Sequence, residues 1–210
     1  MAEGATVATE PGVGRGSRID LYWMPLGAGG RVVRWNGRRY EGWCARRDGR
    51  RPLELYHAAL EVRVPGGRYS IELTPVPDRQ GAARGVTREG PVGSRRLGRF
   101  RPFRYELRCW RDGCLPDLQY AVDSPRGLTD DPLLATAVLS ATASVPALVW
   151  GRDELRVGEM WNSNSVIAWL LASTHVPLCS AEPPRGGRAP GWSAGLAAAR
   201  RSSIAAPPPG

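Results

Sequence analysis

The stretch LELYHAALEVRVPGGRYSIELTPV (53–76) decides the fold, because its polar and apolar side chains alternate on both sides of a glycine pair. With Gly66-Gly67 as the turn, Arg63 would face Ser70 and Glu61 would face Glu72. The side chains then separate into two faces, which a slip of one residue would destroy. The polar face would hold His57, Glu61, Arg63, Ser70, Glu72 and Thr74, and the apolar face Leu60, Val62, Val64, Tyr69, Ile71 and Leu73. We therefore predict an antiparallel hairpin with one buried face.

Further strands are expected on both sides of this hairpin. Upstream, IDLYWMPL (19–26) is typical of a strand, and the segments 31–35 and 38–47 flank Asn36-Gly37, a strong signal for a second hairpin. Downstream, FRYELRCW (103–110) reads as a strand that a turn at Asp112-Gly113 closes.

Helical signals follow the strands. In LTDDPLLATAVLSA (128–141), Thr129 or Asp131 can serve as N-cap, and Pro132 stands early, as at a helix start. A second helix is expected after residue 162. Strands first and helices later predict an α+β domain with a mainly antiparallel sheet and two principal helices.

The second helix starts with an unusual polar cluster, in GEMWNSNSVIAWLL (158–171). Asn162 is the expected N-cap, with Trp161 and Val166 at the two positions of a hydrophobic staple. This accounts for the cluster as a helix cap alone. The alternative is functional: Ser163 would lie in the first turn, where unpaired N–H groups and the helix dipole stabilise negative charge and can hold an oxyanion. A serine there needs a base, and His57 on the polar face of the hairpin is the candidate.

The order of these parts resembles the circularly permuted papain-like fold. That group includes permuted NlpC-type peptidases, lecithin:retinol acyltransferase-like proteins and PPPDE deubiquitinase-like proteins. YHAALEV (56–62) is similar to the strand with the histidine, and WNSNSVIAWLL (161–171) to the helix with the nucleophile, although this chain has serine where the family has cysteine.

The resemblance implies a site and an activity. His57 would be the base, Ser163 the nucleophile, and Thr74 or Glu72 the third, orienting residue, with Asn162 and Asn164 at the oxyanion and helix-cap positions. The chain would then be an acyl-directed hydrolase or acyltransferase without a cofactor, acting on an acyl, amide or peptide substrate. Alternatively, it would be an inactive relative that retains the pocket.

A second hypothesis is a module that binds nucleic acid or another polyanion. Residues 31–51 contain eight arginines interleaved with aromatic residues, and SRRLGRFRPFRY (94–105) repeats this texture. Arginine contacts phosphates while aromatic rings stack on bases. The candidate contacts are Arg38, Arg39, Trp43, Arg46 and Arg47. However, all 29 basic residues are arginine, so a GC-rich coding bias could also produce the net charge of +9.

We expect one α+β domain over residues 18–178, a disordered N-terminal tail (1–17) and a largely disordered tail rich in Pro, Gly and Arg (179–210), interrupted by a short helix near 194–201. No export signal or membrane span is evident, which suggests a cytoplasmic protein. The cysteines form no CxxC pair, so we expect buried free thiols and no metal site; they are Cys44, Cys109, Cys114 and Cys179.

Overall fold

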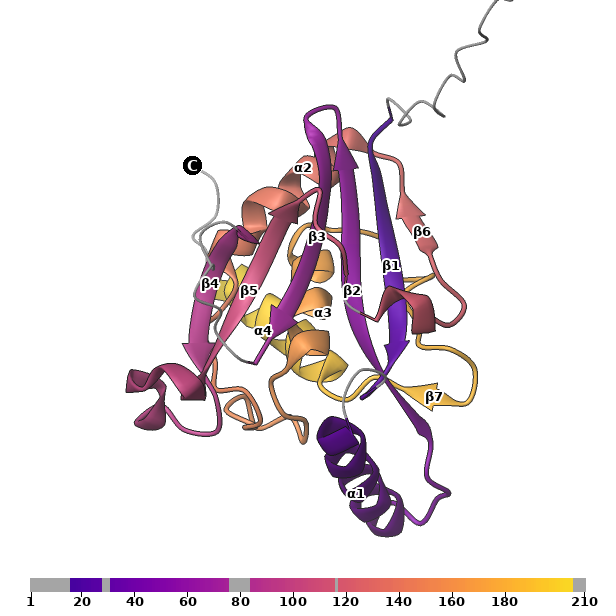
Figure 1. Ribbon diagram of the computed structural model, residues 1–210, viewed down its shortest axis with the longest axis vertical. Coiled ribbons are helices and arrows are strands. Elements are labelled where there is room, and N and C mark those ends of the chain that lie inside the picture. The colour runs from indigo at the N-terminus through magenta and orange to yellow at the C-terminus, as the bar shows by residue number, and fades with distance from the viewer. Residues whose placement is uncertain (1–15, 28–30, 76–83, 116, 206–210) are drawn as a thin grey trace, which may run out of the picture.

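In the described part of the chain the strands form one twisted sheet, and three helices lie on the same side of that sheet (Figure 1). The computed structural model describes residues 16–27, 31–75, 84–115 and 117–205, with main chain alone for 31–38 and 205. In these residues the strands are β1 (Arg18–Pro25), β2 (Glu54–Val64), β3 (Gly67–Thr74), β4 (Val86–Pro91), β5 (Arg104–Arg111), β6 (Arg126–Thr129) and β7 (Gly187–Arg188). The helices are α1 (Arg31–Arg47), α2 (Pro132–Ala141), α3 (Ser163–Ser173) and α4 (Trp192–Ala205).

The strand order is β4-β5-β3-β2-β1-β6, and β7 adds a short parallel pairing to β2. The other pairings between these strands, within the described part of the chain, are antiparallel. The α+β prediction with a mainly antiparallel sheet is therefore confirmed, as are the expected strands at β1 and β5. Helices α2, α3 and α4 lie behind the sheet in Figure 1, while α1 lies below its lower end.

The hairpin of β2 and β3 is confirmed, but its predicted register is wrong by two residues. Glu61 faces Ser70, and Val64 already faces Gly67, so the turn is Pro65-Gly66. The reason is that proline has no N–H to donate and ends the ladder. A shift of two residues leaves every side chain on its predicted face, because the side-chain period of a strand is two.

The second predicted hairpin, at Asn36-Gly37, is wrong, because this pair lies inside α1. Further along the helix, Glu41, Cys44 and Ala45 are buried and Tyr40 is half-buried, at the spacing of a helix face. Burial of this face outweighs the turn preference of Asn-Gly, since glycine in a helix costs only about 1 kcal/mol.

The two faces of the sheet differ in chemistry. The face that α2 and α3 cover is apolar, with Leu60, Val62, Ile71 and Leu107 fully buried. The opposite face carries carboxylates that are nevertheless buried: Glu61 faces Asp20 across the β1–β2 ladder, and the two residues are 3% and 1% exposed. Arg63 and Arg68 bond Glu61, and Arg18 bonds Asp20, which compensates the two charges.

The prediction of a largely disordered C-terminal tail is wrong for residues 179–205. Helix α4 packs on α3, with Ala194, Ala197, Ala198 and Ala199 buried. Gly195 permits this contact, because a Cβ there would collide with the main-chain oxygen of Ser165. The small residues that suggested disorder in fact allow close helix packing. Of the expected N-terminal tail, residues 1–15 lie outside the described part of the chain.

The cysteines are all free, but they are not all buried. Cys44 is buried and Cys109 half-buried, whereas Cys114 and Cys179 are exposed, so the prediction of buried thiols is wrong for the last two. No helix in the described residues is long and apolar enough to cross a membrane.

Candidate functional site

The polar cluster at residues 162–165 starts α3 as predicted. The Asn162 side chain accepts a hydrogen bond from the Ser165 N–H at 3.3 Å, and the Ser165 hydroxyl accepts one from the Asn162 N–H at 3.0 Å. This is a reciprocal capping box. Trp161 and Val166 are both buried in the same core cluster. The cap therefore explains two of the polar side chains.

Asn164 has a different task, which joins α3 to β2. Its side-chain oxygen accepts from the Ala58 N–H at 2.7 Å, and its side-chain nitrogen donates to the Tyr56 carbonyl at 2.9 Å. One amide thus bonds β2 on both sides of His57, in the pattern that a parallel strand would use. Asn164 is 2% exposed, so these bonds are shielded from water. They fix the start of α3 beside His57.

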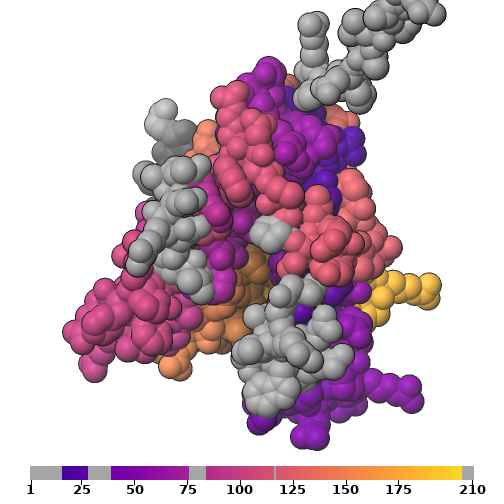
Figure 2. All heavy atoms as spheres, in the orientation of Figure 1, coloured from indigo at the N-terminus to yellow at the C-terminus, as the bar shows by residue number. Residues whose placement is uncertain are grey.

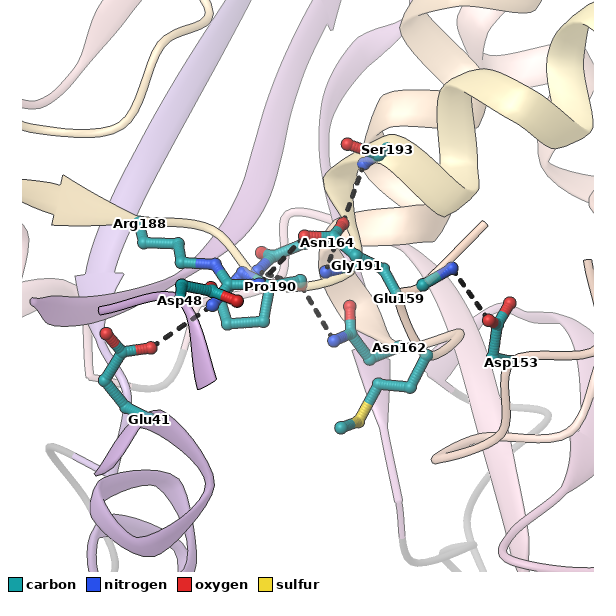
Figure 3. Close-up of polar contacts among 12 residues, drawn as sticks. Glu41, Asp48, Asp153, Glu159, Asn162, Asn164, Arg188, Pro190, Gly191 and Ser193 are labelled. Atoms are coloured by element: carbon teal, nitrogen blue, oxygen red, sulfur yellow. Dashed lines mark hydrogen bonds and ion pairs between the residues drawn. The ribbon is translucent and has the colours of Figure 1, made fainter. Parts of the chain in front are cut away.

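The same cluster also holds the chain that leads into α4 (Figure 3). Asn162 and Asn164 both donate to the Pro190 carbonyl, at 2.8 and 2.9 Å, and Ser165 donates to the Gly191 carbonyl at 2.7 Å. The side chains of Asn162, Asn164 and Ser165 therefore form hydrogen bonds to main-chain groups of other segments. Their first role is structural, and Asn164, which donates from its amide nitrogen to both Tyr56 and Pro190, has no side-chain N–H left to offer an oxyanion.

Ser163 is the exception in this cluster. Its side chain makes no hydrogen bond with any described residue, although the residue is only 9% exposed. It lines a cavity of about 330 Å³, whose wall also includes His57, Tyr40, Met160 and Trp150. The first-turn N–H groups of Ser163 and Asn164 have no partner inside the helix. The structure thus brings the predicted nucleophile and base to one cavity, with an unpaired hydroxyl at a helix start.

His57 is partly buried in the wall of this cavity, and its ring makes no hydrogen bond with Ser163 or with any other described residue. Burial lowers the pKa of His57, and the negative charge of Asp117 opposes this shift. The imidazole is therefore largely neutral at neutral pH, which is the form a general base requires.

Neither Thr74 nor Glu72, the two predicted orienting residues, bonds His57. Glu72 has a pKa raised by burial and an ion pair with Arg108 at 3.8 Å, and Thr74 pairs with Glu106 in the β3–β5 ladder. Asp117 is the acidic residue whose charge acts on His57. It comes from a loop far along the chain, so nothing near His57 in the sequence pointed to it.

A partly buried charge network, which the sequence patterns do not reveal, involves chain neighbours of the cavity-lining residues Tyr40, Met160 and Pro190 (Figure 3). The Glu159 carboxylate accepts from the Gly191 N–H at 3.0 Å and from the Ser193 N–H at 3.1 Å, at the start of α4. Arg188 donates to Glu159 at 3.1 Å and to Glu41 of α1 at 3.3 Å. Glu159 precedes WNSNS by two residues, but its partners are distant in sequence, so no local pattern identified it.

Glu41 and Tyr40 show how closely α1 adjoins this network. Burial would raise the pKa of Glu41, but hydrogen bonds from Arg50 and from the Leu53 N–H lower it, so the carboxylate stays charged. Burial, with a hydrogen bond to Cys44, raises the pKa of Tyr40 to about 12. Tyr40 therefore faces the cavity as a neutral phenol.

The candidate polyanion contacts lie on the outer side of α1. Trp43 is 60% exposed, and the Arg47 guanidinium lies 5.2 Å from its ring centroid, a cation–π contact. Arg39 and Arg46 are exposed as well, whereas the side chain of Arg38 lies outside the described residues. Trp43 is therefore a surface residue available to a partner.

Comparisons with protein-family models, with curated proteins and with solved structures found no match. The resemblance to permuted papain-like proteins therefore stays a prediction. Among the described residues, no group of three or more His, Cys, Asp and Glu side chains could hold a metal ion.

Proposed function

We propose that the cavity at the start of α3 is an acyl-directed site, with Ser163 as nucleophile and His57 as base. The observation that supports this most concerns Ser163: the side chains of its neighbours bond main chain, whereas Ser163 has no side-chain hydrogen bond to a described residue and lines a cavity that His57 also lines. The substrate would be an ester, amide or peptide with an apolar acyl part that contacts Met160 and Trp150.

The reaction would proceed in two steps. The Ser163 oxygen attacks the substrate carbonyl as its proton passes to His57, and the alcohol or amine leaves with that proton. Water, or a second acceptor, then attacks the acyl-serine with His57 again as base. The first-turn N–H groups of Ser163 and Asn164 would donate to the oxyanion. Asp117 would stabilise the imidazolium formed in each step, since its charge raises the pKa of His57.

The hydrogen bond between Ser163 and His57 is not formed in this structure, so substrate binding would have to close it. Catalytic hydrogen bonds are often long without substrate. We also expect a slow enzyme, because no described carboxylate bonds the His57 ring and so none fixes its orientation. In the inactive form of the proposal, Ser163 does not react, and the same cavity binds an acyl or amide ligand without turnover.

A fluorophosphonate probe, which acylation-competent serines attack, tests the proposal. Mass spectrometry should locate the label on Ser163, and Ser163→Ala and His57→Gln should each abolish it. Ser180→Ala, a change at an exposed serine, is the matched control and should leave labelling intact. Labelling that persists in Ser163→Ala, or no labelling of the folded wild type, rejects Ser163 as a nucleophile.

Ser163→Cys provides a second, independent readout. A thiol in the first helical turn next to a base has a lowered pKa and reacts rapidly. We expect iodoacetamide at neutral pH to modify the introduced thiol of this variant at least roughly tenfold faster than the exposed Cys114 of the same chain. An equal or slower rate would show that the cavity does not activate a nucleophile.

The second candidate function, polyanion binding by α1, has one observation in its favour, the exposed Trp43 with Arg47 over its ring. Single-stranded nucleic acid should quench the tryptophan fluorescence, with an affinity that falls steeply with salt. Trp43→Ala should abolish the quenching. We place either activity in the cytoplasm, because all four cysteines are free, as is usual in a reducing compartment.

A further inference from the structure

Residues 94–104 form a surface feature that the proposed site does not use. The segment SRRLGRFRPFR contains five arginines and no acidic residue, with a large apolar side chain at every third position from Leu97 through Phe100 to Phe103. Two consecutive 3₁₀ turns, η2 (Leu97–Arg99) and η3 (Arg101–Phe103), span it. Phe100 lies between the two turns in an extended conformation, so the three apolar residues come from two separate turns and the residue that joins them.

These apolar side chains are all partly exposed to solvent. Leu97 is 40% exposed, Phe100 48% and Phe103 42%. The segment projects from the body of the molecule, at the lower left of the space-filling view (Figure 2). We call residues 94–104 the basic wedge.

The main chain of the basic wedge is held in place rather than loosely attached. Phe100 donates its N–H to Leu97, Phe103 donates to Phe100, and Val92 donates to Phe103, with distances of 2.8 to 3.0 Å. Gly98 sits so close to β4 that a Cβ there would lie 2.6 Å from the Pro91 side chain. The fold therefore presents the apolar side chains outward on a fixed support.

Four of the arginines divide into two groups. Arg95 and Arg104 form ion pairs with Glu154 and Glu89, so they anchor the wedge. Arg96 and Arg99 form no ion pair with any described residue, and the Arg99 guanidinium lies 4.7 Å from the Phe100 ring centroid. Uncompensated positive charge thus surrounds an exposed apolar surface.

We propose that the basic wedge docks on the surface of an anionic lipid bilayer. Leu97, Phe100 and Phe103 would enter the boundary between headgroups and acyl chains, while Arg96 and Arg99 bind the phosphates of anionic lipids. Positive charges without an ion-pair partner among the described residues lie beside exposed aliphatic and aromatic side chains, and this combination favours a lipid surface. A nucleic acid would use the arginines and stack on the phenylalanines, but Leu97 has no ring face to offer a base.

Sedimentation with vesicles tests this, using phosphatidylcholine alone and phosphatidylcholine mixed with phosphatidylserine. Wild type should bind the mixed vesicles more strongly. Phe100→Ser/Phe103→Ser should lower the partition coefficient by roughly a hundredfold, since burial of each ring contributes about tenfold. Arg96→Gln/Arg99→Gln should lower binding to the mixed vesicles by roughly thirtyfold and leave the weak binding to phosphatidylcholine unchanged.

Trp43→Ser is the control, because Trp43 is an aromatic residue even more exposed than Phe100 and Phe103, also with an arginine over its ring, but on α1. It should bind vesicles like wild type, and each variant should remain folded, as an intact cooperative thermal transition would show. Three results would overturn the proposal: no vesicle binding by wild type, equal binding by Phe100→Ser/Phe103→Ser, or loss in Trp43→Ser instead. Binding to single-stranded nucleic acid that needs Phe100 and Phe103, without vesicle binding, would assign the wedge to the other partner class.

Discussion

Asn164→Ala should be the most destabilising single substitution at the start of α3. The side chain bonds the Ala58 N–H, the Tyr56 carbonyl and the Pro190 carbonyl, and it is 2% exposed. In the variant, Pro190 keeps its bond from Asn162, but the groups on β2 lose their partner. An unsatisfied buried polar group costs roughly 1–3 kcal/mol, so these two should together cost about 4 kcal/mol of the free energy of unfolding.

Urea denaturation followed by far-UV circular dichroism measures this loss. Two neighbouring substitutions are matched controls. Asn162→Ala removes the cap and should cost about 1 kcal/mol, and Ser163→Ala breaks no hydrogen bond to a described residue and should cost less than about 0.5 kcal/mol. Asn164→Asp keeps an acceptor for Ala58 but has no donor for Tyr56, so it should also be strongly destabilising. A loss below about 1 kcal/mol in Asn164→Ala would refute the role assigned to this amide.

Three further outcomes are expected. Burial lowers the pKa of His57 below its ordinary 6.5, so His57 of the unfolded chain takes up a proton at a higher pH than His57 of the folded protein. The free energy of unfolding should therefore decrease as the pH falls below about 6.5. His57→Gln should flatten that part of the profile. Burial raises the pKa of Cys109 to about 11, so iodoacetamide at pH about 8 should modify the exposed Cys114 and Cys179 first, as peptide mass spectrometry would show; equal labelling would contradict its burial. Glu159→Gln should cost about 2–3 kcal/mol in urea denaturation, because it weakens the bonds to Arg188 and to the start of α4; an unchanged midpoint would show that the network contributes nothing.

Local patterns predicted the parts of the fold in which neighbouring residues decide the structure. The alternation around residues 57–73 identified the faces of the central hairpin, and the cap at Asn162 identified the start of α3. Each of these depends on contacts within one or two elements. Even so, the predicted hairpin register is wrong by two residues, because a Gly66-Gly67 turn would put Pro65 in the ladder, where proline has no N–H to donate.

The errors occurred where tertiary contacts override local preference. The Asn-Gly pair in α1 favours a turn in isolation, but burial of Cys44 and Ala45 on one side of the segment favours a helix. The Ala- and Gly-rich end of the chain resembles a tail until α3 is present, when Gly195 allows close contact with it. In the same way, Asp117 and Glu159 reach the site from distant segments, so no spacing in the sequence could connect them to His57.

The polar side chains at the start of α3 bond main-chain groups of other segments, and this has a genetic consequence. The side chains are those of Asn162, Asn164 and Ser165, and the main-chain groups belong to Tyr56, Ala58, Pro190 and Gly191. A second-site substitution can restore a lost side-chain partner, but it cannot move a carbonyl or an N–H. Suppressor screens against Asn164→Ala should therefore yield globally stabilising changes elsewhere in the chain and no reciprocal substitution at these contacts. In evolution, the same positions would be retained or lost as a set, without covarying partners on β2.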